Sequence, residues 1–386
     1  MYKIQTLNKI AKIGIDKLGE GYEVADTIEN PDAIILRSFN MHEMDIPESV
    51  QAIARAGAGV NNIPIEKCSE RGIVVFNTPG ANANAVKELV IAGLLLASRK
   101  VTDAVEWAKT LKGEGDAVGK LVEKGKSNFA GPELYGKTLG VIGLGAIGVM
   151  VANTAYRLGM DVIGYDPYIS VEAAWGISRH VEKSNDLGDM ISKCDYISLH
   201  LPLNDGTRDM INADLLSKAK DGIRILNFAR GELVNSDDIV AALESGKVLS
   251  YVTDFPNEKV LCVPGVVAIP HLGASTPESE DNCAIMAAKQ LKDFLENGNI
   301  KNSVNFPSCV EPKTSENRIF IAHKNIPNMI ATLSGVLSGK NMNIEHMTNK
   351  SKKELAVTLI DTDDNVSQDI IDEIKGNPAV LSVRLI

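Results

Sequence analysis

A glycine-rich segment carries the clearest chemical signal in this sequence. Residues 143–148 read Gly-Leu-Gly-Ala-Ile-Gly, after the apolar stretch 138–142 and before a predicted helix. Glycines at this spacing allow a tight turn, close approach of a pyrophosphate to the backbone, and packing of the helix on the strand. The pyrophosphate would lie on the amides at the positive end of that helix. The spacing therefore predicts a dinucleotide site, whereas the motif without this context would indicate only a tight turn.

An acidic residue selects the dinucleotide. Asp166 follows the next predicted strand, 23 residues after Gly143, close to the ~20 expected for the acid that binds the ribose. A carboxylate accepts hydrogen bonds from both ribose hydroxyls but repels a 2′-phosphate, and no arginine follows directly. The sequence therefore predicts NAD in preference to NADP.

Two further segments have residue types suited to oxidising a 2-hydroxy acid. Arg230, in Asn-Phe-Ala-Arg-Gly (227–231), follows a predicted strand, and His271 lies in Pro-His-Leu-Gly-Ala-Ser-Thr (270–276). Such an oxidation moves a hydride from C2 and a proton from the hydroxyl, and histidine is the natural base near neutral pH. An arginine would hold the substrate carboxylate with its planar fork. Taken singly, the arginine could be a structural ion-pair partner and the histidine a core residue.

The elements around these residues predict a doubly wound parallel sheet. Apolar strands alternate with helical segments after residue 137. The predicted strands are 138–142, 161–165, 196–200, 224–228 and 266–269.

The N-terminal part predicts a smaller α/β layer. Strands are expected at 2–6, 33–37 and 73–77. Residues 84–99 predict one helix that is apolar all round and packs between domains or subunits. Residues 101–137 predict a helix followed by a long surface segment.

The C-terminal part predicts a third fold. Residues 301–316 have the composition of a linker. The remaining ~70 residues predict the order βαββαβ, which gives a ferredoxin-like sandwich. Its predicted elements are 318–323, 327–339, 344–349, 355–360, 366–376 and 380–385.

Taken together, the glycine motif, the NxARG segment and the PHLGAST segment resemble the D-isomer-specific 2-hydroxyacid dehydrogenases, and the resemblance extends over nearly the whole chain. It implies an α/β protein with a Rossmann cofactor domain, a flavodoxin-like substrate domain and a C-terminal ACT domain. The expected boundaries are 1–85 with 275–300 for the substrate domain, 86–274 for the NAD domain, 301–316 for the linker and 317–386 for the ACT domain.

By this resemblance, His271 is the acid/base and Arg230 binds the substrate carboxylate. Asp254 would contact the nicotinamide amide. The expected cofactor-binding residues are Gly143, Gly145, Ala146, Ile147, Gly148, Asp166, His200, Pro202, Thr207, Phe228, Ala229, Arg230, Asp254, His271, Gly273 and Ala274.

The carboxylate that orients His271 is ambiguous. Counted from Arg230, the family's glutamate falls at or next to Lys259, and Glu258 is the neighbouring acid. We assign Glu258, with a one-residue shift in this loop; a neighbouring acid is the alternative.

The N-terminal loops are the expected substrate side. Arg37 and Arg55 would bind a phosphate, because an acidic protein must concentrate positive charge locally to hold an anion. The alternative is that both are solvated surface arginines. The expected substrate-binding set is Arg37, Arg55, Ala58, Gly59, Val60, Asn61, Asn82, Arg230 and His271.

The segment 323–328 resembles the opening loop of an ACT domain. His323, Asn325 and Asn343 match effector positions that bind serine in related dehydrogenases. Asn328 stands where the family usually has glycine, which leaves serine inhibition or a purely oligomeric role as alternatives. Since ACT domains commonly pair edge to edge, we expect a homodimer or homotetramer.

Composition excludes several other classes. The net charge of −10 argues against nucleic acid or an anionic membrane as partner. The five cysteines are scattered without CxxC spacing, which predicts reduced thiols and no metal site. No signal-peptide core is visible, and the longest apolar run, 89–97, is far shorter than the ~20 residues of a membrane span. We expect a cytoplasmic protein.

The resemblance implies NAD-dependent oxidation of 3-phospho-D-glycerate to 3-phosphohydroxypyruvate, the first step of phosphorylated serine biosynthesis. Within the family, a glyoxylate, hydroxypyruvate or 2-oxoglutarate reductase is the alternative. In a different class, the chain could be a non-catalytic NADH sensor, which the presence of Arg230 and His271 disfavours.

Overall fold

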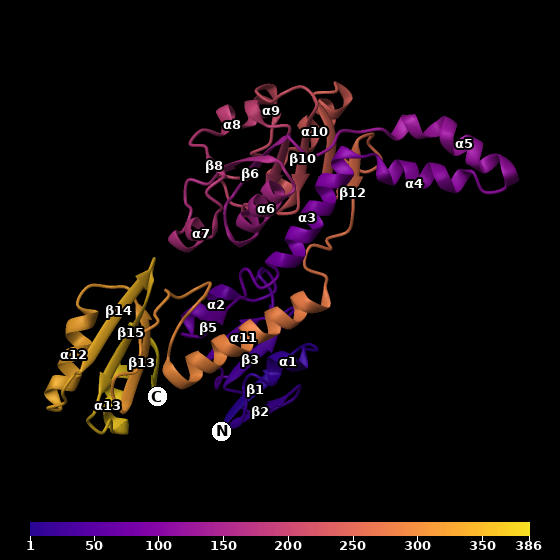
Figure 1. Cartoon of the computed structure of the whole chain (residues 1–386). Helices are drawn as coiled ribbons and strands as arrows, with labels where there is room; N and C mark the ends of the chain where they lie inside the picture. The colour runs from indigo at the N-terminus through magenta and orange to yellow at the C-terminus, as the bar shows by residue number, and fades with distance from the viewer. The chain divides into compact units, whose positions relative to one another are not determined.

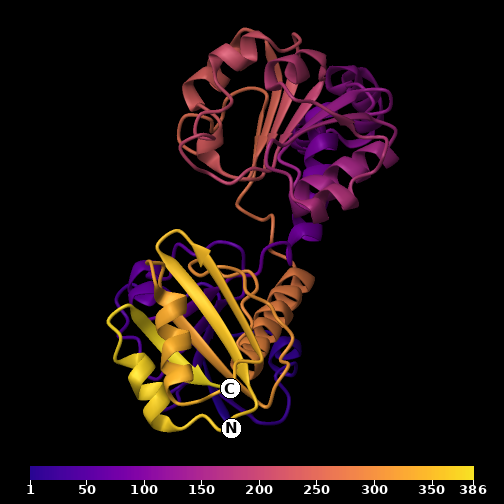
Figure 2. The same cartoon turned by 90° about the vertical axis from the view of Figure 1, so that its left-hand side faces the viewer.

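The computed structural model describes residues 1–386 and divides them into two compact units (Figures 1 and 2). Unit 1 contains Met1–Asn82 and Pro277–Ile386, and unit 2 contains Ala83–Thr276. No helix of the chain is both long enough and apolar enough to span a bilayer.

Unit 2 is built on a seven-stranded, entirely parallel sheet. The strands lie in the order β12-β11-β10-β9-β6-β7-β8. When the strands are numbered along the chain from β6 and read from β8 to β12, the order is 3-2-1-4-5-6-7. This is the Rossmann order extended by one strand, as predicted. The strands are β6 (Thr138–Ile142), β7 (Asp161–Tyr165), β8 (Glu182–Lys183), β9 (Tyr196–Leu199), β10 (Ile223–Asn227), β11 (Val248–Thr253) and β12 (Val266–Ala268).

Helices cover both faces of this sheet (Figure 1). The long predicted helix is α3 (Ala83–Ser98), and it buries Val90 and Leu94 against the sheet while Leu95 is exposed. A Cβ on Gly93 would lie 2.8 Å from the Phe228 ring, so this glycine lets α3 approach the sheet closely. The other helices are α6 (Ala146–Arg157), α7 (Val171–Gly176), α8 (Leu187–Lys193), α9 (Ala213–Ser217) and α10 (Ser236–Glu244), with a 3-10 turn at Gly231–Leu233.

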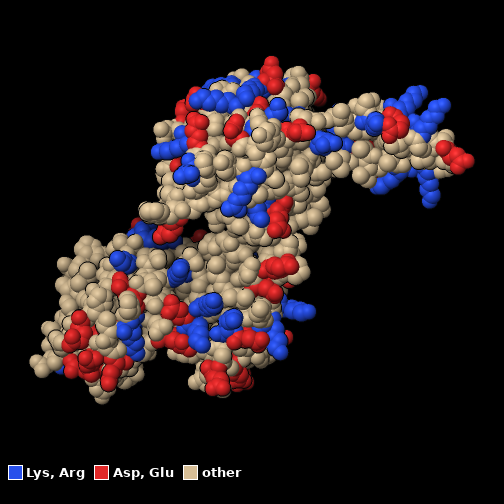
Figure 3. Space-filling view, viewed as in Figure 1, with Lys and Arg blue, Asp and Glu red and all other residues tan.

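A helical hairpin projects from unit 2 and carries a group of exposed lysines (Figures 1 and 3). It consists of α4 (Val101–Thr110) and α5 (Val118–Gly125), flanked by 3-10 turns at Gly115–Ala117 and Lys126–Phe129. The prediction of one helix and a surface segment missed α5. Trp107 packs on Phe129, with 5.2 Å between ring centroids, and holds the hairpin closed.

Unit 1 begins with a five-stranded parallel sheet in the order β2-β1-β3-β4-β5. This is the flavodoxin-like order that the resemblance implied. The elements are β1 (Tyr2–Thr6), α1 (Lys12–Ile15), β2 (Tyr22–Ala25), β3 (Ala33–Leu36), β4 (Ala52–Arg55), α2 (Ile65–Glu70) and β5 (Val74–Phe76), covered by α11 (Pro277–Asn297).

The C-terminal part of unit 1 is a four-stranded antiparallel sheet in the order β14-β15-β13-β16. Its element order is βαββαβ, as predicted for a ferredoxin-like sandwich. The elements are β13 (Asn317–Lys324), α12 (Met329–Gly339), β14 (His346–Lys352), β15 (Leu355–Thr362), α13 (Gln368–Lys375) and β16 (Val380–Leu385).

The two sheets of unit 1 share one hydrophobic core. Phe294 of α11 packs edge-on against Phe76 of β5 and Phe320 of β13, with 5.7 and 5.2 Å between ring centroids. The segment 301–316 is packed against this core, although its composition suggested a linker, because Phe306 and Cys309 are buried in it. A bridge between Ile300 and Cys309 anchors the segment.

A buried ion pair fastens the C-terminal sheet at the same place. The Arg318 guanidinium on β13 donates two hydrogen bonds to the Asp361 carboxylate on β15, of 2.6 and 2.8 Å, and both side chains are fully buried. Its remaining N–H groups donate to the carbonyls of Asn297, Glu311 and Pro312. Burial raises the pKa of Asp361, but the hydrogen bonds from Arg318 and Thr314 outweigh it, so the pKa is lowered.

Arg318→Met should destabilise the protein strongly, because it leaves the Asp361 charge buried without its partner. We expect a loss of about 3–5 kcal/mol in the free energy of unfolding, measured with urea. The folded-state pKa of Asp361 is lowered, so the stability that the ion pair contributes is fully present above the unfolded-state pKa of the carboxyl. It is lost as the pH falls through the folded-state pKa. Lys193→Met, which breaks an exposed pair with Asp189, is the control. Equal effects of the two substitutions would contradict the prediction.

Candidate active site

The parallel register of unit 2 brings the ends of six strands into one row. Six residues pair across the sheet where their strands end. In sheet order they are Ala268, Thr253, Asn227, Leu199, Ile142 and Tyr165. The segments that follow them contain most of the predicted cofactor and catalytic residues, at the edge where α/β proteins bind ligands.

Each glycine of the motif occupies a distinct steric position. Gly143 has φ +91°, and a Cβ there would lie 2.6 Å from the His200 carbonyl oxygen. A Cβ on Gly148 would lie 1.9 Å from the Gly143 carbonyl oxygen, so only glycine lets α6 approach β6. Gly145 is different, because nothing lies within 4 Å of its Cβ position. The backbone at Gly145 therefore faces open space, as a pyrophosphate site requires.

The first turn of α6 is available to an anion. Gly145 is the N-cap, no side chain caps the helix, and no acid lies in its first turn, which begins with Ala146 and Ile147. Backbone N–H groups at such a terminus attract a phosphate.

Asp166 is already bonded to the glycine turn. Its two carboxylate oxygens accept hydrogen bonds from the Leu144 and Tyr168 amides, both of 2.8 Å. Each oxygen retains a second lone pair, so the same carboxylate can accept from ribose hydroxyls while it fixes the turn.

His200 lies against the glycine turn and is not suited to act as a base. Its Nε2 bonds to the Ser198 hydroxyl at 2.8 Å, and burial lowers its pKa to about 3. The ring is therefore neutral at physiological pH. In the following loop, the Thr207 hydroxyl donates to the Pro202 carbonyl at 2.7 Å, which fixes this side of the predicted cofactor site.

Arg230 is exposed just after β10, beyond the half-buried Ala229. The buried Asn227 side chain donates to the Arg230 carbonyl at 2.8 Å and accepts from the Ala229 amide at 3.2 Å. This asparagine fixes the backbone that presents the arginine, which explains the residue type at the first position of the NxARG segment.

Asp254 is the carboxylate buried at this edge. It is 1% exposed, and its Oδ2 accepts a weak hydrogen bond of 3.4 Å from the Gly273 amide, beside Ala274. Its Oδ1 is buried without any partner. Burial raises the pKa of Asp254, although the interactions with His271 and Arg230 act to lower it. An unpaired buried acceptor is costly unless a ligand supplies the donor.

His271 is exposed and packs on Phe255, with 4.4 Å between ring centroids. Glu258, the acid we assigned to orient it, is exposed and makes no hydrogen bond or ion pair with the histidine. Glu258 instead lines a pocket of about 620 Å³ together with Phe255 and Gly231. Lys259 pairs with Asp237 at 2.7 Å. Asp254 is the carboxylate that His271 influences electrostatically.

The predicted substrate residues of unit 1 surround the end of β3. The Asn8 side-chain oxygen accepts hydrogen bonds from the amides of Arg37, Ser38 and Phe39, of 3.0, 3.0 and 2.9 Å. Arg55 Nε donates to the Arg37 carbonyl at 3.0 Å, so both faces of this turn are held. No sequence pattern indicated Asn8, because it is distant along the chain from the turn that it organises.

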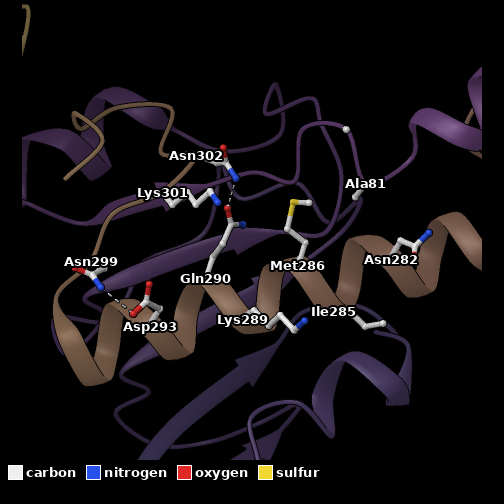
Figure 4. Close-up of a pocket in the computed structure, with 11 residues that line it drawn as sticks. Ala81, Asn282, Ile285, Met286, Lys289, Gln290, Asp293, Asn299, Lys301 and Asn302 are labelled. Carbon is white, nitrogen blue, oxygen red and sulfur yellow. Dashed lines mark hydrogen bonds between the residues drawn. The ribbon is translucent and has the colours of Figure 1, made fainter. Parts of the chain in front are cut away.

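The loop after β4 is tied to a third segment. Asn77 donates to the Ala58 carbonyl at 2.6 Å, and its own carbonyl accepts from the buried Gln290 of α11 at 2.9 Å. Asn77 thus links Ala58, the first residue of the predicted loop 58–61, to α11. Behind this network lies a pocket of about 520 Å³ (Figure 4). Its walls include Met286, Lys289, Asn302 and Ala81, the last next to the predicted Asn82.

The predicted effector residues are bonded within the C-terminal sheet. His323 is 1% exposed, its Nδ1 bonds to the Lys324 carbonyl at 2.8 Å, and its Nε2 lies 2.9 Å from the Thr358 hydroxyl. Asn325 donates to the Lys353 carbonyl, and Asn343 pairs with Glu345. Asn328 adopts φ +67° at the start of α12, which explains why glycine suits that position.

These observations fit a bound dinucleotide. The chain offers an uncapped helix N-terminus, open space at Gly145 and a buried acceptor at Asp254. No cluster of His, Cys, Asp or Glu side chains in the chain could hold a metal ion.

Known proteins are similar to this chain over long stretches. Residues 91–273 match the family described as D-isomer specific 2-hydroxyacid dehydrogenase, NAD binding domain, which agrees with the predicted cofactor, NAD. The chain is 37% identical to a hydroxypyruvate reductase of Thermotoga maritima over 281 residues, which are 70% of this chain and 86% of that protein.

A second relative and a solved structure share another name. The chain is 34% identical to a D-3-phosphoglycerate dehydrogenase of Methanocaldococcus jannaschii over 319 residues, 80% of this chain and 58% of that protein. This chain thus spans little more than half of that relative. The NAD⁺-bound 3-phosphoglycerate dehydrogenase of Entamoeba histolytica is 29% identical, with a TM-score of 0.59 over 79% of this chain and 98% of that one. The match to the reductase over most of its length decides the family: the chain belongs to the D-isomer-specific 2-hydroxyacid dehydrogenases.

Proposed function

We propose that the protein is a D-3-phosphoglycerate dehydrogenase, which oxidises 3-phospho-D-glycerate to 3-phosphohydroxypyruvate with NAD. The observation that carries the proposal is that Arg55, at the end of β4, donates to the carbonyl of Arg37, so that two arginines belong to one organised region of unit 1. In an acidic chain, two arginines held in one region concentrate the positive charge that a highly charged anion requires. Relatives named D-3-phosphoglycerate dehydrogenase support this substrate.

The catalytic residues divide the chemistry between them. The guanidinium of Arg230 binds the substrate carboxylate through two parallel hydrogen bonds and polarises the C2 oxygen. The His271 imidazole removes the hydroxyl proton. A nicotinamide bound here would supply the acceptor for the hydride that leaves C2. The charge of His271 increases as it takes the proton, and the nearby Asp254 carboxylate stabilises that charge.

Asp254 has the additional role of positioning the cofactor. Its unpaired Oδ1 is the acceptor that a carboxamide N–H of the nicotinamide would satisfy. The Asp166 carboxylate would bind the adenosine ribose, and the amides of Ala146 and Ile147 the pyrophosphate.

A hydroxypyruvate reductase is the second candidate. The Thermotoga relative with that name supports it, and it is covered over 86% of its length. The same Arg230 and His271 would serve the reverse reaction, with His271 as the proton donor. The two candidates differ in whether the substrate carries a phosphate, and therefore in what Arg37 contributes.

His271→Asn should lower kcat by roughly 10²–10⁴-fold, because the base is lost while the side chain keeps a similar shape. Binding of NADH, measured by fluorescence titration, should be nearly unchanged. His180→Asn, which alters an exposed histidine stacked on Tyr156, is the matched control. Retention of full turnover by His271→Asn would remove this residue from the mechanism.

Arg37→Ala should separate the two candidate substrates. Loss of charge-assisted hydrogen bonds to a phosphate should raise KM for 3-phosphoglycerate roughly ten-fold or more. KM for unphosphorylated hydroxypyruvate should change by less than about two-fold, since that substrate has no group for Arg37. Arg179→Ala, in the other unit, serves as control. Unchanged KM for 3-phosphoglycerate would refute the phosphate assignment.

Asp254→Asn should make the ligand-free protein more stable at pH 8. Because burial raises the folded-state pKa, the ionised carboxylate costs stability above its unfolded pKa, and the cost grows as pH rises toward the folded pKa. We expect a gain of about 1 kcal/mol in the free energy of unfolding at pH 8, shrinking toward pH 4. Affinity for NADH should fall, because the acceptor loses its charge. A destabilised variant that binds NADH normally would contradict both roles.

A further inference from the structure

The Arg37 side chain has one partner in the structure, a carboxylate on another segment. Its Nη1 lies 2.6 Å from Oε1 of Glu280, in the first turns of α11. Both side chains are nearly half exposed, at 42% and 46%, so the pair is open to solvent and to a ligand. Residues 37 and 280 are far apart along the chain but belong to the same unit.

The backbone at Arg37 is restrained by hydrogen bonds from several side chains. Asn8 holds the three consecutive amides from Arg37 to Phe39, and Arg55 together with Asn62 holds the Arg37 carbonyl. The side chain is the part that remains free to exchange partners. A phosphate that approaches Arg37 therefore meets a guanidinium whose charge is already neutralised by Glu280.

The sign of the effect follows from charge. A phosphate and the Glu280 carboxylate compete for one cation and repel each other, because like charges a few ångströms apart are unfavourable. A substrate without a phosphate leaves the Arg37–Glu280 pair intact. The carboxylate thus penalises phosphorylated ligands selectively.

We propose that Glu280 is a specificity-determining residue that weakens binding of phosphorylated substrates by competing for Arg37. This proposal rests on the proposed function only in taking Arg37 as the phosphate ligand. Glu280 acts only through Arg37 and has no part in hydride or proton transfer.

Glu280→Gln tests the proposal, because it keeps the shape and removes the charge. KM for 3-phosphoglycerate should fall roughly two- to five-fold, the size of an exposed ion-pair interaction. We expect kcat and the KM for hydroxypyruvate to be unchanged. Glu278→Gln, on an exposed acid of the same helical turn without an ion pair, is the matched control and should leave all constants unchanged.

The pairing itself is tested in an Arg37→Ala background, where Glu280→Gln should no longer affect KM for 3-phosphoglycerate. A persisting effect would mean that the carboxylate acts through general surface charge. A rise in KM for 3-phosphoglycerate on Glu280→Gln would mean that the carboxylate orients Arg37 for the phosphate. Either result overturns the proposal.

Direct binding of inorganic phosphate separates this proposal from the proposed function. Isothermal titration of the full-length protein should give a two- to five-fold smaller dissociation constant for Glu280→Gln than for the wild type. If the wild type fails to oxidise 3-phosphoglycerate yet this difference is found, the proposed function fails and the competition stands. Equal phosphate affinity of the two proteins, or no binding by either, overturns the competition.

Discussion

The parallel pairing of unit 2 is the constraint on which the catalytic arrangement depends. Because every strand runs in the same direction and the register aligns Ile142, Leu199, Asn227 and Thr253, the chain must leave the sheet at one edge each time. The segments that follow are brought together at this edge however distant they are in sequence. A one-residue shift in the register of β10 would move its side chains to the opposite face of the sheet and displace Arg230 from this row.

The polar groups at this edge differ in whether their hydrogen bonds are satisfied within the protein. Asp254 is almost inaccessible and has an oxygen without a partner, and Gly145 faces empty space. The unpaired oxygen of Asp254 costs stability in the free protein, and a ligand that donates a hydrogen bond to it would remove that cost. By contrast, His200 and Asn227 are satisfied internally, and their role is to fix the backbone.

The C-terminal sheet is joined to the N-terminal sheet of unit 1 more tightly than a tethered domain would be. Phe320 and Phe294 belong to one hydrophobic core, and Arg384 of β16 donates to Gln51 just before β4 and to the Phe294 carbonyl. Composition suggested a flexible linker at 301–316, but Phe306 is the kind of apolar residue that can anchor such a segment.

The sequence alone determined the local patterns: the glycine turn, the strand periodicity, the βαββαβ order and the residue types of the NxARG and PHLGAST segments. These could be predicted because they depend on steric and hydrogen-bonding rules within a few residues. Only the tertiary structure decided that Asn8 holds the Arg37 turn and that Glu280 pairs with Arg37. It also decided that Asp254 is the acid that His271 influences, whereas Glu258 is exposed. Those contacts join segments distant in the chain, and an exposed carboxylate or amide carries no periodicity that would reveal its partner before the fold brings them together.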